Sequence, residues 1–208
     1  MSMSELAQTG KISRTSLRTR ARIVEAVVEM ITRHGISGTT IANVAKAAGV
    51  SQGVVVFHFK TKEHLLAQTL LALFDEYRQC WQQAAATVEP LERVLGLMAA
   101  DFDPRICTRE KLAVWFAFWG EAAAKPLYNR ICTEAEEERA AAMREACLDL
   151  ARIADIADPL KLAHAIDAHT DGLWLQMHIQ GSETSLSDPL GNALGHLRML
   201  VPDMADRF

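Results

Sequence analysis

The chain has 208 residues, of which 50% are hydrophobic and 23% are charged, ordinary globular values that exclude disordered, collagen-like and polyanionic-tail proteins. Its net charge of -4 is the sum of +5 over residues 1–66 (9 Lys and Arg, 4 Asp and Glu) and -9 over residues 67–208 (13 and 22). A basic end on an acidic body indicates that the N-terminal part meets a polyanion, although a chance distribution would give the same sums.

Apolar residues recur at spacings of three and four, which predicts an all-α protein of about nine helices. The first helix is expected from Leu17 to Arg33, with Gly35 as its left-handed C-terminal cap. Thr39 is expected to cap a short second helix over Ile41–Ala48.

Ser51 is expected to cap a third short helix, and Lys62 to about Thr87 reads as a long fourth helix with one apolar face. Proline is tolerated in the first turn of a helix and breaks its interior. Five prolines therefore mark positions where helices could begin: Pro90, Pro104, Pro126, Pro159 and Pro189. The acidic run at residues 134–138 is expected to be a solvated helix face.

The segment TTIANVAKAAGVSQGVVVFHFKTKEHLL, residues 39–66, has the parts of a helix-turn-helix. Gly49 permits the positive φ of the sharp turn, and the third helix offers Gln52 to adenine and Val54 to a thymine methyl group. Lys62 falls in the first turn of the next helix, where an anion is also attracted by backbone N–H groups. Three short helices with a glycine turn also occur in domains that do not bind DNA, where they only pack against one another. The expected DNA-binding residues are Thr39, Thr40, Ser51, Gln52, Val54, His58, Lys60 and Lys62.

Together with the preceding helix around RARIVEAVVEMITRHG, this segment resembles the N-terminal signature of the TetR family of bacterial repressors. The resemblance implies a homodimer that binds a partly palindromic double-stranded DNA operator and is released by a small-molecule inducer. Separately, the lack of a secretory signal at the N-terminus makes the cytoplasm the expected compartment. Val56 departs from the family, which usually has a tyrosine there, so a phosphate contact is expected to be missing. Phe57 is expected to be a core residue rather than its replacement.

The arm before the first helix carries five basic residues: Lys11, Arg14, Arg18, Arg20 and Arg22. These residues are expected either to be solvated or to approach phosphates or an adjacent minor groove.

Four aromatic residues fall within five positions of the body: Trp115, Phe116, Phe118 and Trp119. Periodicity alone favours an aromatic core seam.

A later helix places His164, Asp167, Asp171 and Trp174 on a common face. Buried carboxylates need a partner, and we expect an ion pair with a neighbouring histidine, a metal site being the lesser alternative.

Aromatic rings beside a carboxylate are what a quaternary ammonium ligand requires. The stretches DFDPR, KLAVWFAFWGEAAAKPLYNRI and DGLWLQ resemble body segments of the BetI-type regulators in that family, which repress glycine betaine synthesis genes and respond to choline. The resemblance implies a choline-type inducer, an unrelated small molecule being the alternative. The candidate ligand-binding residues are Trp115, Phe118, Trp119, Asp171, Trp174, Phe102 and Tyr128.

The expected organisation is a basic arm over residues 1–15, a helix-turn-helix domain over 16–62 and a ligand-binding and dimerisation domain over 63–208. The last two predicted helices, Pro159–Gly181 and Asp188–Leu200, are expected to pack against their copies in a four-helix dimer interface, an intramolecular pair being the alternative.

Other functional classes have little support in this sequence. The four cysteines form no CxxC motif, so we expect reduced thiols and no metal or cofactor. No uncharged stretch approaches the roughly 20 residues that cross a bilayer, and the N-terminus lacks the apolar region of a secretory signal. An all-α enzyme is disfavoured because no nucleophile elbow, P-loop or dinucleotide fingerprint is present, and a helical adaptor protein is the third alternative.

Overall fold

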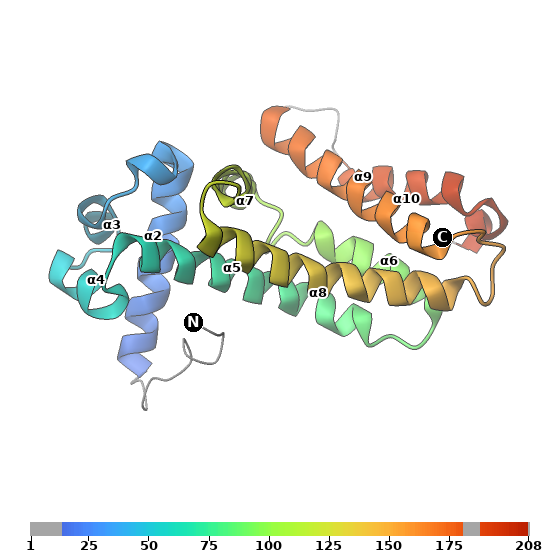
Figure 1. Ribbon diagram of the computed structural model, residues 1–208, viewed down its shortest axis with the longest axis horizontal. Helices are drawn as coiled ribbons and strands as arrows, with labels where there is room; N and C mark the ends of the chain where they lie inside the picture. The colour runs from blue at the N-terminus through green and yellow to red at the C-terminus, as the bar shows by residue number, and fades with distance from the viewer. Residues whose placement is uncertain (1–13, 181–187, 208) are drawn as a thin grey trace. The chain divides into compact units, whose positions relative to one another are not determined.

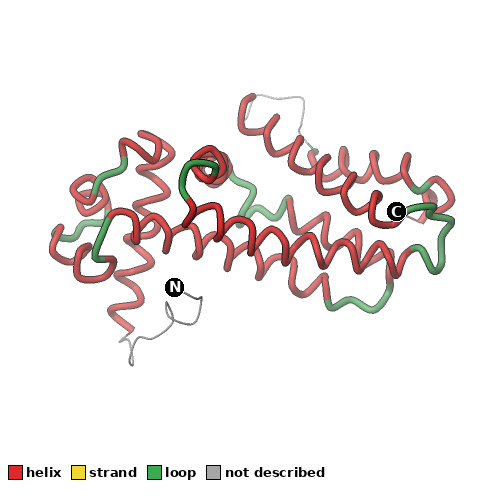
Figure 2. The backbone as a smooth tube through the Cα atoms, in the orientation of Figure 1, coloured by secondary structure: helices red, strands yellow, loops and turns green. Residues whose placement is uncertain are grey.

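The fold of the described residues is built from helices alone (Figure 2). The structure is a computed structural model, which describes residues 14–180 and 188–207. Within these ranges there are nine α-helices, one 3-10 helix and no strand, as the hydrophobic spacing predicts. Two compact units meet in sequence between Thr69 and Leu70. In the same ranges, no helix is long and apolar enough to cross a membrane.

The first unit contains α2 (Arg14–Gly38), α3 (Ile41–Ala47), α4 (Gln52–Phe59) and the start of α5 (Lys62–Ala85) (Figure 1). Gly35 has the positive φ that the sequence predicts, 66°, and its non-helical backbone ends the first helical segment of α2. A further helical turn follows the kink and extends α2 to Gly38.

The cap of α3 is Thr40, so the prediction of Thr39 was wrong by one residue. The Thr40 hydroxyl accepts a hydrogen bond from the Asn43 backbone N–H (3.2 Å), and the Asn43 side chain accepts one from the Thr40 N–H (2.7 Å). Two orphan donors are thereby satisfied at once. Thr39 is 1% exposed, and its hydroxyl donates to the Gly35 carbonyl at 2.8 Å. Its hydroxyl therefore stabilises the chain just before the helix.

The turn between α3 and α4 has the predicted geometry. Gly49 has a φ of 62°, and the Val50 N–H donates to the Ala45 carbonyl at 3.0 Å. The Ser51 hydroxyl accepts from the Val54 N–H at 3.3 Å, which confirms Ser51 as the cap of α4.

The second unit contains the rest of α5 and five further α-helices, followed by the 3-10 helix η2 (Pro202–Arg207). The α-helices are α6 (Pro90–Asp101), α7 (Arg109–Ala122), α8 (Pro126–Leu150), α9 (Pro159–Gln180) and α10 (Pro189–Leu200). Four of the five prolines start a helix as predicted. Pro104 does not, because it lies in a turn and α7 begins only after Thr108, whose hydroxyl accepts from the Lys111 N–H at 3.2 Å.

The core of the second unit lies around α8, which packs against α6, α7 and α9. Val94, Leu97, Met143, Cys147 and Leu150 are fully buried there. This packing brings α8 and α9 side by side, and the polar residues on their facing sides form the candidate site.

Candidate functional site

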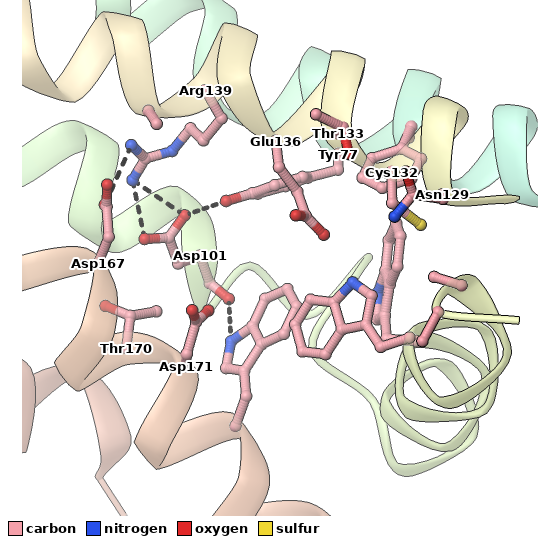
Figure 3. A pocket seen from close by; sticks show the side chains of 17 residues that line it. Tyr77, Asp101, Asn129, Cys132, Thr133, Glu136, Arg139, Asp167, Thr170 and Asp171 are labelled. Carbon is pink, nitrogen blue, oxygen red and sulfur yellow. Dashed lines mark hydrogen bonds and ion pairs between the residues drawn. The ribbon is translucent and has the colours of Figure 1, made fainter. Parts of the chain in front are cut away.

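A cavity of about 530 Å³ lies inside the second unit, with a wall of residues from α5, α6, α7, α8 and α9 (Figure 3). This volume lies within the range of small-molecule sites, about 300–1,000 Å³. Aromatic residues form one part of the wall: Phe74, Tyr77, Trp115, Trp119 and Trp174. Four carboxylates and one cation form another: Asp101, Glu136, Asp167, Asp171 and Arg139.

Three of the aromatic rings surround a common point. The ring centroids of Tyr77, Trp115 and Trp174 are 6.1–6.4 Å from one another. Trp119 stacks beside Trp174 at 6.3 Å with an interplanar angle of 18°. The Trp174 indole N–H donates to the Asp101 carbonyl at 2.9 Å, which fixes its ring. Ring faces held in this way can attract a cation.

Arg139 is the buried centre of the charged part. One of its terminal nitrogens, Nη2, donates to both Asp101 carboxylate oxygens (3.1 and 2.8 Å) and to the Leu97 carbonyl (3.1 Å). The Tyr77 hydroxyl donates to Asp101 at 2.5 Å. The other terminal nitrogen, Nη1, lies 3.7 Å from the nearest Asp167 oxygen. Arg139 therefore neutralises Asp101 directly and Asp167 only at longer range.

The expected histidine partner of the buried aspartates was wrong, because the cation is Arg139 on α8. Glu136, one turn before it, lines the cavity and is also exposed, like the other acidic residues of the run, which confirms the predicted solvated face. Its spacing of three from Arg139 is the sequence signal that could have placed both on one helix face. Among the described residues, no group of three His, Cys, Asp or Glu side chains is placed to hold a metal ion.

Burial raises the pKa of the Asp167 carboxyl to about 7. The positive charge of Arg139 opposes this rise, and the negative charges of Asp101 and Asp171 add to it. The Asp167 carboxyl is thus close to half protonated near neutral pH.

The pKa values of Asp171 and Glu136 are raised in the same direction, mainly by burial. The Trp119 indole N–H opposes the rise at Glu136, although the two groups form no hydrogen bond of good geometry. The charge of Asp171 also raises the pKa of Glu136, so these two carboxylates lie near each other. A positive charge in the cavity would favour the ionised form of all three carboxylates.

Four of the seven predicted ligand-binding residues line the cavity: Trp115, Trp119, Asp171 and Trp174. The other three do not. Phe118 and Tyr128 are buried against each other with ring centroids 5.3 Å apart, and Phe102 packs against the hydrophobic core. The cavity also contains Tyr77, Asp101 and Arg139, which the sequence analysis missed.

The predicted DNA-binding residues lie around α4 in the first unit. Their side chains are at least partly exposed except that of Thr39, which is buried: Thr40, Ser51, Gln52, Val54, His58, Lys60 and Lys62. The Lys62 ammonium donates to the Ser37 carbonyl at 3.2 Å at the N-terminus of α5. Burial, together with the charges of Arg20 and Lys60, lowers the pKa of His58, which favours the neutral imidazole.

Two of the basic residues grouped with the arm belong to the folded head. The Arg20 guanidinium donates to the His58 carbonyl (3.3 Å) and to the Gln68 side chain (3.0 Å). Arg22 donates to the Ala48 carbonyl beside the turn. Both therefore hold the head together. Arg14 and Arg18 are exposed on α2, and residues 1–13 with Lys11 lie outside the described residues.

The prediction that Phe57 belongs to the core was wrong. Phe57 is 70% exposed, whereas Phe59 is 1% exposed. Val55 and Phe59 are four residues apart and share the buried face of α4, so a residue between them must point elsewhere. The Lys60 ammonium lies 5.6 Å from the Phe57 ring. Phe57 and Val56, which is 43% exposed, give this part of α4 an apolar surface.

Comparison with known proteins shows similarity over both units. Residues 23–69 match the family of bacterial regulatory proteins of the tetR type, and residues 90–190 match the C-terminal domain of the BetI-type transcriptional repressors. The HTH-type transcriptional regulator BetI of Paraburkholderia xenovorans (strain LB400) is 28% identical over 187 residues, which are 88% of this chain and 93% of that protein.

Solved structures share the fold. A transcriptional regulator of Pseudomonas aeruginosa PAO1 has a TM-score of 0.78 at 24% identity, covering 95% of this chain and 98% of the other. A transcriptional regulator of Saccharomonospora viridis in complex with choline has a TM-score of 0.69 at 20% identity, covering 91% and 96%.

Proposed function

As a member of the TetR family with a BetI-type C-terminal domain, this chain is a transcriptional regulator, and we propose that it is a dimeric repressor released from its operator by a small quaternary ammonium cation. Ligand and operator oppose each other when they favour different states of the dimer. Their antagonism is then a coupling free energy, typically about 1–3 kcal/mol.

The observation that carries the ligand assignment is the combination of aromatic rings and carboxylates in one cavity. A quaternary ammonium has no N–H to donate, so ring faces and a nearby negative charge are the groups that bind it. Trp115 and Trp174 supply faces, and Asp171 and Glu136 supply the charge. The choline complex of the Saccharomonospora viridis protein, which has the same fold, supports this class of ligand. A zwitterion such as glycine betaine would bring its own carboxylate against these acids and should bind less well.

We expect millimolar choline to raise the melting temperature of this protein, with betaine aldehyde acting similarly and glycine betaine acting less. A ligand that binds only the folded state adds about 2.7 kcal/mol at 100 times its Kd. Asp171→Asn, which removes the charge and keeps the shape, should abolish most of the shift. Asp155→Asn is the matched control, because Asp155 is exposed outside the cavity. A shift as large with glycine betaine as with choline would contradict a site for cations.

For the DNA-binding head, we propose that Gln52 and Val54 face base edges while Thr40, Ser51, His58, Lys60 and Lys62 approach phosphates. Thr39 acts indirectly in this proposal, since its hydroxyl is buried on the Gly35 carbonyl. The exposed surface of Phe57 and Val56 adds apolar contact, for which thymine methyl groups are the matching partners.

Lys62→Ala should weaken binding to all duplexes alike and lower the slope of log K against log[salt] by about 0.9. Gln52→Ala should instead change the preference among operator sequences. Both are measured by fluorescence anisotropy on labelled duplexes over a salt titration. Lys161→Ala is the control, because Lys161 is exposed on α9 and pairs with Asp158, which directly precedes that helix. An unchanged slope in Lys62→Ala would remove the phosphate contact from this residue.

We propose that α9 and α10 form the dimer interface with a second copy. Five large apolar side chains are exposed on these helices: Leu160, Leu175, Ile179, Met199 and Leu200. A second copy would cover them, and two heads about 34–36 Å apart would read successive major grooves of a palindromic operator.

A further inference from the structure

The cavity holds more negative charge than one quaternary ammonium can balance. Arg139 is the one cation among the residues that line it, and its direct hydrogen bonds go to Asp101. Three carboxylates that line the cavity therefore have no hydrogen bond from this cation: Glu136, Asp167 and Asp171. Arg139 reaches Asp167 only at 3.7 Å, and neither Glu136 nor Asp171 has an ion pair within 4 Å in the described part of the chain. The Asp167 side chain is 31% exposed, and Asp171 and Glu136 are exposed, so water solvates these carboxylates in part; a cation bound among them would relieve their mutual repulsion.

These carboxylates are spread along the cavity. On α9, Asp167, Asp171 and Trp174 follow at spacings of four and three, so they lie on one helix face and span about 10 Å along its axis. On α8, Glu136 precedes Arg139 by three residues and lies between Arg139 and Cys132 (Figure 3). Asp167 therefore lies beside Arg139 at one end of the cavity. Trp174 lies at the other, aromatic end, and Asp171 and Glu136 lie between the two ends.

A second, independent observation in the same wall indicates a bound molecule. Trp115 is 1% exposed, and its indole N–H has no hydrogen-bond partner in the described structure. A buried donor without a partner costs free energy, so an acceptor in the cavity would stabilise the site. The surrounding carboxylates disfavour an anionic acceptor, which leaves a neutral oxygen of a hydroxyl, ether or ester group.

We propose that the natural ligand carries two positive centres joined by a short chain, one against the rings of Trp115 and Trp174 and the other beside Asp167. This inference rests on the proposed cation site and extends it from a monocation to a dication. Asp171 and Glu136 balance the centre at the aromatic end, and Asp167 balances the second. A neutral oxygen in the chain would accept from the Trp115 indole. The cavity volume of about 530 Å³ gives room for such a chain.

The second centre gives the site a defined pH dependence. The titratable groups that face Asp167 come from four helices: Tyr77, Asp101, Arg139, Arg144, Cys147 and Asp171. The pKa values of Tyr77, Cys147 and Arg139 are raised above their usual values, so none of these three titrates near neutrality. With its pKa of about 7, Asp167 gains its charge as the pH rises through this value. A dication should therefore gain affinity over a monocation as the pH increases from about 6 to about 8.

The test compares choline with a bis(trimethylammonium) alkane of six-carbon spacer on the full chain by isothermal titration calorimetry. At the higher pH we expect the dication to bind about tenfold more tightly than choline, and most of this advantage to vanish at the lower pH. Asp167→Asn should lower the affinity of the dication to about that of choline for the same variant at both pH values. Retained choline binding also shows that this variant is folded, and Asp155→Asn is the charge-matched control outside the cavity.

The outcomes separate the two proposals. If choline binds and the dication binds no more tightly at the higher pH, the second centre is wrong and the cation site stands. If the advantage survives Asp167→Asn, the placement of the second centre beside Asp167 is wrong. If neither cation binds while the protein still binds duplex DNA, both ligand proposals are wrong. The pH comparison needs no variant, so it decides the question even if Asp167→Asn does not fold.

Discussion

Replacing Arg139 by methionine should lower the free energy of unfolding by about 3–5 kcal/mol. The change removes the cation that holds Asp101 and leaves that carboxylate buried, with the Tyr77 hydroxyl as its remaining side-chain donor among the described residues. An unpaired buried charge costs more than the pair contributed, because neither water nor protein then solvates it. Urea denaturation, with the slope compared between variants, measures the loss.

Arg144→Met is the matched control on the same helix. Arg144 pairs with Glu137 at 2.5 Å, but its side chain is 37% exposed and that of Glu137 is 66% exposed, and pairs at the surface contribute about 0–1 kcal/mol. Adding Asp101→Asn to Arg139→Met should restore part of the lost stability, since the stranded charge is then gone. Equal losses in Arg139→Met and Arg144→Met would contradict the assignment of Arg139 as the buried centre of this network.

Phe59→Ala should cost about 3–5 kcal/mol, because it removes a buried ring from the core of the head. Phe59 is 1% exposed, and the Arg20 guanidinium lies 4.8 Å from its ring centroid. Phe57→Ala should change stability by no more than about 0.5 kcal/mol, because that ring is already 70% exposed.

The same two variants separate folding from recognition. Phe57→Ala should keep its melting temperature and change its operator affinity, whereas Phe59→Ala should lose stability first. The measurements are thermal melting and anisotropy on the same preparations. A large loss of stability in Phe57→Ala would show that this ring belongs to the core after all.

Features of the fold that depend on neighbouring residues could be predicted from the sequence. Gly49 and Ser51 act within a few residues of themselves, so the turn and the cap of α4 follow from residue type alone. Thr39 and Thr40 are adjacent and chemically alike, so only the backbone decides which of them caps α3. Pro104 shows the same limit, since a proline allows a helix to begin but does not require it.

The candidate site could be predicted only in part. Its aromatic residues were visible as a dense cluster, but periodicity could not separate Trp115, which lines the cavity, from Phe118, which packs on Tyr128. The charged part joins Asp101 on α6 to Arg139 on α8, 38 residues away, and no local pattern connects them. Tertiary packing makes this pair.

The positions of the tryptophans allow intrinsic fluorescence to report on the ligand cavity. The chain has four, and three of them, Trp115, Trp119 and Trp174, line the cavity, while the fourth is Trp81. The first unit, up to Thr69, contains none. Intrinsic fluorescence is therefore a label-free record of what occupies the cavity. Any change in tryptophan emission that operator DNA causes in the unlabelled protein must come from the second unit. A fluorescence titration with DNA therefore measures the coupling between the DNA-binding head and the ligand cavity.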